Sequence, residues 1–431
     1  MSKEENRKNF SKYVSQNILG MIGFSCYVLA DSYFISIAKG ADGLTALNLV
    51  MPLYSIIFSI GEMIGVGSAI RYAISKIKKD ADADDYFWNA LIWCIMSSMI
   101  FVFAGIFFSA DIMRVLGADE HIVAVGNNYT KIFMCFAPMF MCNYVTNAFV
   151  RNDGAPGIAM SATLFSSLFN IVFDYILMFP MNLGMEGAAL ATALSPIIGM
   201  GICSIHFFSK KSSVRLVVCK PSVRKLVAGC QLGISAFVGE MSSAVITLAF
   251  NFVILKLAGN VGVAAYGVVA NIAIVTTAVF NGVAQGSQPL ISSCFGRGDK
   301  DGCTQLKRMG YTTAFVLAAV MYSILFIFAG QFVAVFNSEG SEMLRLYATE
   351  GVKLYFIGIF FAGINIVGGG AFSATEDAFK AAVVSVARGF VLILGAVFVM
   401  SALFGMTGVW LAYAVAEGIT TFIMLVMALR V

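Results

Sequence analysis

Charged residues are scarce in this sequence. Asp, Glu, Lys and Arg together make up 12% of its 431 residues, whereas hydrophobic residues make up 59% and the mean hydropathy is +0.86. A water-soluble globule of this length needs more polar surface than such a composition provides. The scarcity therefore excludes a soluble protein and predicts a chain that crosses a membrane many times. The net charge of +4 is small and dispersed, so we expect no nucleic-acid partner.

The sequence also lacks the residue patterns of metal sites and of common catalytic sites. Its nine cysteines show no Cys-x-x-Cys or Cys/His spacing, and its two histidines, His121 and His206, are isolated. This predicts free thiols, with neither a disulfide framework nor a metal site. There is no HExxH motif or nucleophile and base that would suggest a membrane enzyme, and no segment resembles a channel filter. We expect no enzymatic activity and no cofactor other than a coupling ion.

What the sequence does contain is a series of apolar runs, each long enough to cross a bilayer, which takes about 20 residues. Cutting the chain at its polar turns gives twelve of them, at 14–38, 44–74, 86–109, 122–150, 158–180, 187–208, 226–257, 263–294, 311–335, 343–372, 379–403 and 409–429. No cleavage-site pattern precedes the first run, which is therefore expected to be a retained span. The chain is expected to be an all-α polytopic membrane protein.

The positions of Lys and Arg test this count. If the N-terminus is cytoplasmic, 22 of the 28 Lys and Arg fall in segments on the cytoplasmic side, among them Arg71, Arg151, Arg388 and Arg430. Such an excess of positive charge on the inner side supports both the even number of spans and the orientation. We expect both termini to be cytoplasmic, and the short loops suit the inner, or plasma, membrane of a bacterium or archaeon.

The two halves of the chain repeat one another. The segment GMEGAALATALS at 184–195 matches GMTGVWLAYAVA at 405–416, with six identities at an offset of 221, and Gly43 maps to Gly262 at an offset of 219. This predicts two six-helix bundles, 1–208 and 226–431, joined by a basic cytoplasmic linker at 209–225. Because each half has an even number of spans, the bundles should be related by a pseudo-two-fold axis along the membrane normal, with a cleft between them.

Five acids lie inside the apolar runs: Asp31, Glu62, Asp174, Glu240 and Glu417. A charged group in the middle of a bilayer costs about 2.5 to 3.5 kcal/mol on insertion scales, so it is usually retained for a function. The alternative for each is a structural ion pair or a hydrogen-bonded acid in the core.

The acid Asp174 belongs to a polar stripe on an otherwise apolar helix, formed by Thr163, Ser166, Ser167, Asn170 and Asp174. The spacing places these residues on one face, which should point to the interior of the first bundle. In the first run, Tyr27 and Asp31 fall near one face. If Asp31 and Asp174 approach each other in low dielectric, one of them should hold a proton near neutral pH. A proton-coupled carrier needs this property.

The other acids are less specific. Glu240 shares a helix face with Thr247 and Asn251, and it could bind a sodium ion, bind a cationic substrate or bond to a neighbouring helix. Glu62, Tyr27 and Glu417 are candidates for the substrate cleft, where some of the many aromatic residues could form a wall that tolerates cations.

Five segments form distinctive motifs: FVRNDGAPGIAM at 149–160, NIVFDY at 170–175, GMEGAALATALS at 184–195, NGVAQGSQPLISSCFGRGD at 281–299 and LADSYF at 29–34. Together they resemble motifs of the MATE (multidrug and toxic compound extrusion) transporters. The resemblance implies a V-shaped pair of six-helix bundles that exports organic cations or amphipathic compounds in exchange for protons or sodium ions.

The resemblance also implies roles for individual residues. Asp31, Asn170 and Asp174 match the first-bundle positions involved in proton or cation coupling, and Glu240 matches an acid of the seventh helix that members of the family use for cation binding. The segment 358–370 departs from the pattern, because it lacks the acid that some sodium-coupled members carry there.

A rival reading is a flippase of the same wider superfamily that moves lipid-linked oligosaccharides. Such a protein often has cationic cleft residues that meet phosphates, and the exceptions to the acidic cleft here are Arg71, Lys131 and Lys353. The mostly acidic candidates favour a cationic substrate. The expected partners are a small cationic or amphipathic molecule and the lipid bilayer, and the expected state is a monomer.

Overall fold

The computed structural model describes residues 3–336 and 341–429, and every regular element in these ranges is helical. The elements of the first half are α1 (Lys3–Lys78), α2 (Asp85–Val115), α3 (Glu120–Cys135), α4 (Ala137–Asn152), α5 (Pro156–Met178) and α6 (Gly184–Phe207). Those of the second half are α7 (Val223–Gly296), α8 (Lys300–Ile327), α9 (Ala329–Phe336), α10 (Glu342–Tyr355), η1 (Phe356–Gly358), α11 (Ile359–Ala374), α12 (Ala378–Val386), the π-helical η2 (Ala387–Val391) and α13 (Leu392–Leu429). Arg430, one of the predicted cytoplasmic charges, lies outside the described residues.

Three helices fold back on themselves at a glycine. α7 has 74 residues, which as one straight helix would measure about 110 Å, several times the thickness of a bilayer core. The chain reverses at Gly259, whose φ is +61°, and it does the same at Gly40 in α1 and at Gly405 in α13, where φ is +57° and +60°. Residues other than glycine rarely adopt these backbone angles. Each of these helices therefore supplies parts of two spans.

The described residues contain twelve membrane spans once these reversals are counted. Nine helical segments are long and apolar enough to cross a membrane, and α3 with α4, which are bent by 46° at their junction, makes a tenth. Two of the nine, Val223–Gly296 and Ala378–Ala428, reverse at Gly259 and Gly405 and so cross twice. The predicted number of spans is consistent with this fold.

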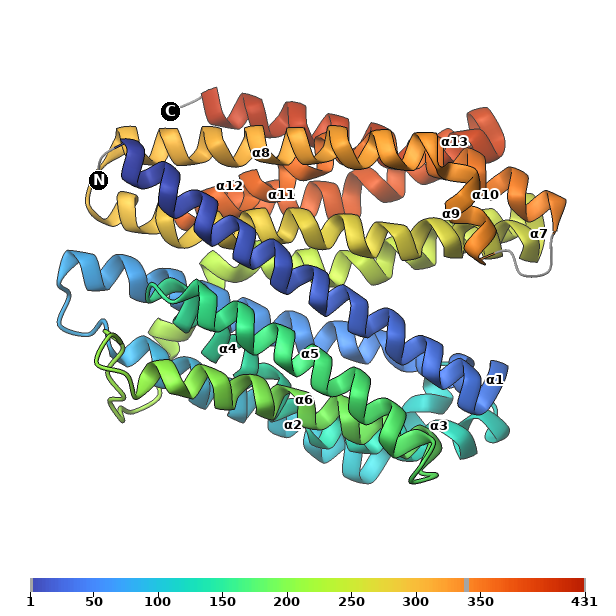
Figure 1. Ribbon diagram of the computed structural model, residues 1–431, viewed down its shortest axis with the longest axis horizontal. Helices are drawn as coiled ribbons and strands as arrows, with labels where there is room; N and C mark the ends of the chain where they lie inside the picture. The colour runs from blue at the N-terminus through green and yellow to red at the C-terminus, as the bar shows by residue number, and fades with distance from the viewer. Residues whose placement is uncertain (1–2, 337–340, 430–431) are drawn as a thin grey trace.

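The helices lie side by side in two groups (Figure 1). The first half, coloured blue to green, forms one group, and the second half, coloured yellow to red, forms the other. The first segment of α1 crosses from one group to the other. Its residues Phe10 and Val14 belong to the hydrophobic cluster of the second half, whereas Gly20 and Gly23 pack against Met160 and Leu164 of α5.

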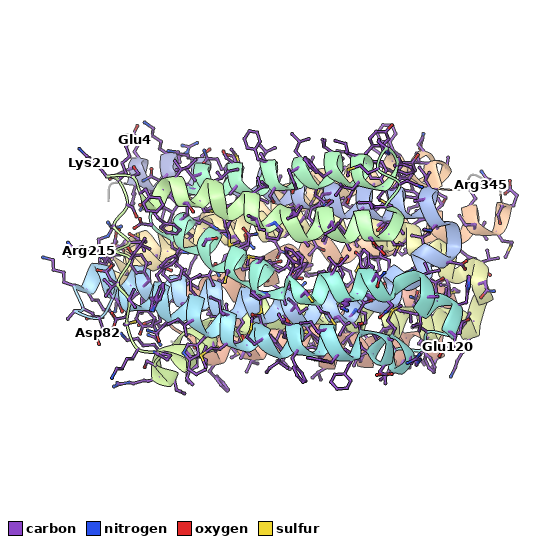
Figure 2. The ribbon with its side chains drawn as sticks, turned by 90° about the horizontal axis from the view of Figure 1, so that it is seen from below. Glu4, Asp82, Glu120, Lys210, Arg215 and Arg345 are labelled. Carbon is purple, nitrogen blue, oxygen red and sulfur yellow. The ribbon has the colours of Figure 1, made fainter. Side chains whose placement is uncertain are left out.

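The ends of the molecule are charged and its sides are apolar. Figure 2 shows Glu4, Asp82, Lys210 and Arg215 at one end and Glu120 and Arg345 at the other. Between the ends, large apolar side chains are exposed, among them Ile100, Phe103, Phe107, Phe165, Leu248 and Phe422. Such a surface requires a lipid environment, and the protein is a multi-pass membrane protein.

Candidate functional site

A cavity of about 400 Å³ lies between the two groups of helices. This volume is typical of pockets for small molecules, which measure roughly 300 to 1,000 Å³. Both halves of the chain line the cavity, and among the described lining residues four are charged: Asp31, Glu62, Glu240 and Arg388. Tyr27, also predicted for the cleft, lines the wall beside Asp31.

One end of the seam between the halves is closed by glycine contacts. Gly67 in α1 packs against the backbone of Gly229 and Gly233 in α7, so closely that a Cβ at Gly67 would overlap the carbonyl oxygen of Gly229. In the same way, Gly286 of α7 packs against Val14 of α1. The closed end is the one that holds the N-terminal residues and the segment between α6 and α7 (Figures 1 and 2).

Ion pairs reinforce this closed end. Arg71, near the end of α1, pairs with Glu376 in the turn after α11, and Nζ of Lys78 lies 3.5 Å from Oε2 of the same carboxylate. Both contacts join the first half of the chain to the second. A single carboxylate in a turn of the second half therefore holds two cations of the first half.

Asp31, Asn170 and Asp174 come together inside the first group of helices. Asp31 from α1 is 7% exposed and faces the cavity, whereas Asp174 from α5 is fully buried behind it. In the orientation that satisfies its neighbours, the Asn170 amide donates to Oδ2 of Asp174 at 3.1 Å and accepts from the hydroxyl of Thr192 at 3.2 Å. The two carboxylates are close enough to interact electrostatically.

Two carboxylate oxygen atoms of this cluster indicate what it could bind. Oδ1 of Asp31 and Oδ1 of Asp174 are both buried without a hydrogen-bond partner. A buried carboxylate oxygen without a donor is costly. A proton or a small cation would satisfy such a pair of oxygens, so the residues fit the coupling ion expected from the sequence.

Glu62 and Glu240 lie on the cavity wall where it meets a smaller cavity of about 100 Å³. They are near enough to interact, and Oε1 of Glu62 accepts a hydrogen bond from Nε2 of Gln285 at 3.3 Å. Oε1 of Gln285 accepts from Arg151. The chain of bonds from Glu62 through Gln285 to Arg151 crosses from α1 to α7 and back to α4.

Sequence reasoning counted Arg151 among the charges on the cytoplasmic side and did not predict that its side chain is buried. The residue is 7% exposed at the C-terminal end of α4, and it bonds to Gln285 and to Asn147. Its guanidinium also borders the smaller cavity. The only available signal was that Arg151 directly follows an apolar run, which did not distinguish a buried arginine from one in a loop.

Glu417 is at the back of the wall and does not face the open cavity. Its carboxylate pairs with Arg388, with Nη2 to Oε1 at 2.7 Å, and accepts from Nδ2 of Asn365 at 2.7 Å. Arg388 was placed among the cytoplasmic charges, and the structure corrects this too. The position is about ten residues inside the eleventh apolar run, which is a signal that an arginine of this kind is buried.

The comparisons with known proteins agree with the architecture. A family model described as MatE matches residues 17–176 and 236–399. The multidrug export protein MepA of Staphylococcus aureus is 28% identical over 414 residues, covering 93% of this chain and 89% of that protein. MepA of Staphylococcus saprophyticus is 26% identical over 405 residues, with the same coverage.

Two solved structures share the fold. The outward-facing conformation of a multidrug resistance MATE family transporter of the MOP superfamily superposes with a TM-score of 0.92 at 20% identity, covering 99% of this chain and 96% of that one. A MOP superfamily transporter from Pyrococcus furiosus, described as having a binding pocket of reverse polarity, superposes with a TM-score of 0.91 at 19% identity. The match covers 99% of this chain and 95% of that one. Because the family model matches most of both halves, this chain belongs to the MatE family of membrane transporters.

Proposed function

We propose that this protein is a secondary active antiporter that exports organic cations or amphipathic compounds in exchange for protons or sodium ions. It works in a bacterial plasma membrane with both termini cytoplasmic. The names of the MepA relatives support export of several drugs, and the three acids that line the cavity support a cationic substrate. The excess of Lys and Arg at the closed end supports the orientation.

The observation that carries the proposal is the cluster of Asp31, Asn170 and Asp174. One of its two unpartnered carboxylate oxygens belongs to Asp31 in the cavity wall, and the other belongs to Asp174, which is buried behind it. Two such groups in low dielectric cannot both remain ionised without a counter-ion. Uptake of a proton or cation changes the charge between the two helices and therefore how they pack, which couples the ion to the cavity.

Alternating access follows from the seam. We propose that residues 1–208 and 226–431 move as two bundles about the segment 209–225, and that the glycine contacts around Gly67 form the closed inner gate of an outward-facing state. Glu240 acts as a second acid for the cation, and Glu62 and Tyr27 contact the substrate. Glu417 influences the site through Arg388.

The test uses everted vesicles that contain the protein and a fluorescent organic cation. A pH gradient or a sodium gradient, imposed separately, should drive dye uptake, and Asp174→Asn should abolish it because the amide cannot take up the ion. Asp111→Asn is the matched control, since Asp111 is an exposed acid paired with Arg114 at the end of α2. Normal transport by Asp174→Asn would show that this cluster is not the coupling site. Binding of a lipid pyrophosphate without dye export would favour the flippase.

A further inference from the structure

Arg388 is a cation in the wall of a cavity whose other charged lining residues, among those described, are acids. It lies on the π-helical turn η2, between α12 and α13. Such turns are uncommon and occur often at functional sites. Gly389, the next residue, packs against Ser242 of α7, so a side chain there would overlap its neighbour. The turn is therefore fixed against the helix that also carries Glu240.

Glu417 binds the guanidinium of Arg388 on the side away from the cavity. Nε and Nη2 of Arg388 both donate to Oε1 of Glu417, at 3.0 and 2.7 Å. The side chain of Glu417 is 3% exposed and that of Arg388 is 18% exposed, so the arginine stands between the carboxylate and the cavity. A guanidinium has five N–H donors in a planar fork, and Glu417 uses the Nε and Nη2 edge. The hydroxyl of Tyr413, which also lines the cavity, contacts the same guanidinium, and at least two of the five N–H donors remain for a ligand.

The burial of this ion pair is weak evidence that it serves stability. A buried pair of this kind is often no better for folding than apolar residues of the same volume. A largely buried guanidinium beside a cavity can bind a second planar anion, because the geometry of its N–H donors matches that of a carboxylate. Asn365 donates to Oε2 of Glu417, and Thr421 donates to Oδ1 of Asn365, so the carboxylate stays oriented while the arginine shares its charge.

We propose that Arg388 forms the subsite that binds the carboxylate group of a zwitterionic substrate. The cationic group of such a molecule lies toward Asp31, Glu62 and Glu240, and its carboxylate lies against the guanidinium. The inference rests on the proposed export function and assigns a residue to one end of the substrate. Glu417 neutralises part of the charge that Arg388 presents to the substrate carboxylate, and it holds the guanidinium in place, which makes it a positioning residue.

Two dyes that differ in one group test the subsite. One is a zwitterionic rhodamine with a free carboxylate, and the other is its methyl ester, which carries only the cation. Uptake of both into everted vesicles gives the ratio of the KM for the zwitterion to the KM for the ester. The double variant Arg388→Gln with Glu417→Gln removes both charges together and leaves neither buried charge unpaired. It should raise the ratio at least tenfold, since a hydrogen bond to a charged group contributes more to binding than the free energy of one tenfold step in affinity.

The single variant Glu417→Gln should move the ratio the other way. It removes the neutralising carboxylate, so Arg388 presents its full charge to the substrate and the ratio should fall. A purely structural role for the pair would not give opposite changes. The matched control is Arg345→Gln with Glu342→Gln, which neutralises an exposed pair 2.9 Å apart at the far end of the molecule. This control should leave the ratio at the wild-type value.

The outcomes separate the two proposals. If the ester is transported, Asp174→Asn stops it, and the ratio does not respond to the Arg388 and Glu417 variants, the subsite is wrong while the export function stands. The same conclusion follows if both variants shift the ratio in one direction. If the wild-type protein transports neither dye under any gradient, the export function fails and the subsite fails with it.

Discussion

Asp153 joins segments that are far apart in the sequence. The residue follows α4 in a charged turn, but its carboxylate accepts hydrogen bonds from the hydroxyl of Tyr72 at 3.2 Å, from Nε2 of His206 at 2.8 Å and from the backbone N–H of Ser213 at 2.9 Å. The side chains of Asp153 and His206 are almost fully buried. This one carboxylate therefore attaches the segment between α6 and α7 to the first half of the chain.

Asp153→Asn should loosen that segment. The amide nitrogen replaces one acceptor oxygen, and each buried donor left unpaired costs about 1 to 3 kcal/mol. We expect a lower melting temperature in detergent and faster trypsin cleavage at Lys210 and Lys211. Asp301→Asn, at the exposed start of α8, is the control and should change neither. Unchanged cleavage of Asp153→Asn would mean that the carboxylate does not hold the segment.

The intramembrane acids show which properties of a single residue the sequence predicts and which it does not. Helical spacing correctly placed Asn170 and Asp174 on one face, because residues four apart on a helix are neighbours whatever surrounds them. The same reasoning could not separate Asp174 from Glu417. The first has an unpartnered oxygen, and the second is paired with Arg388 from another helix. Whether a buried acid finds a cation depends on packing between helices.

At the scale of the element, α7 depends on one backbone angle. Gly259 has φ +61° and ψ −158°, a region that is essentially restricted to glycine. Without it the 74-residue helix could not return across the membrane.

Gly259→Ala should therefore be strained by about 1 to 3 kcal/mol and lower the melting temperature of the purified protein. Gly267→Ala is the matched control on the same helix. A Cβ there meets no heavy atom within 4 Å, and the residue has ordinary helical angles. An equal melting temperature for the two variants would contradict the strain at Gly259.

Prolines show why the boundaries of elements were harder to predict than their existence. Pro52, Pro196 and Pro289 lie inside helices, whereas Pro138 sits in the first turn of α4, directly after the 46° bend between α3 and α4. In lipid, a proline is tolerated within a helix when neighbouring groups satisfy the freed carbonyl. The sequence around each proline does not say whether those neighbours exist.

At the scale of the whole molecule, the repeat extends to the backbone. Gly40 and Gly259, which are related by the offset of 219, have φ of +57° and +61°. Gly184 and Gly405, which are related by the offset of 221, have φ of +52° and +60°. The two halves therefore turn at equivalent positions, as expected after a duplication.

The close glycine contacts at the closed end of the seam predict what a larger side chain there would do. Gly67→Val would overlap the backbone of Gly229, so the two halves could not close at this end. We expect dye transport to fall below about a tenth of the wild-type rate, because one of the two states that alternating access requires is lost. Cys230, beside the contact, should react faster with a maleimide, as measured by mass spectrometry.

Gly201→Val is the control for this experiment. Gly201 is exposed on α6, and a Cβ there meets no heavy atom within 4 Å. This variant should transport dye and label like the wild type. If Gly67→Val did the same, the glycine contacts would not be a gate.

The sequence by itself determined the membrane class, the number of spans, the internal repeat and the acids on one face of α5. These follow from hydropathy and helical periodicity, which act over a few neighbouring residues. Only the tertiary structure decided that Arg151 is buried, that Arg388 and Glu417 are paired and that the seam closes at the end of Gly67. Each of these depends on contacts between helices far apart in the chain, where close packing selects the partner of a buried charge.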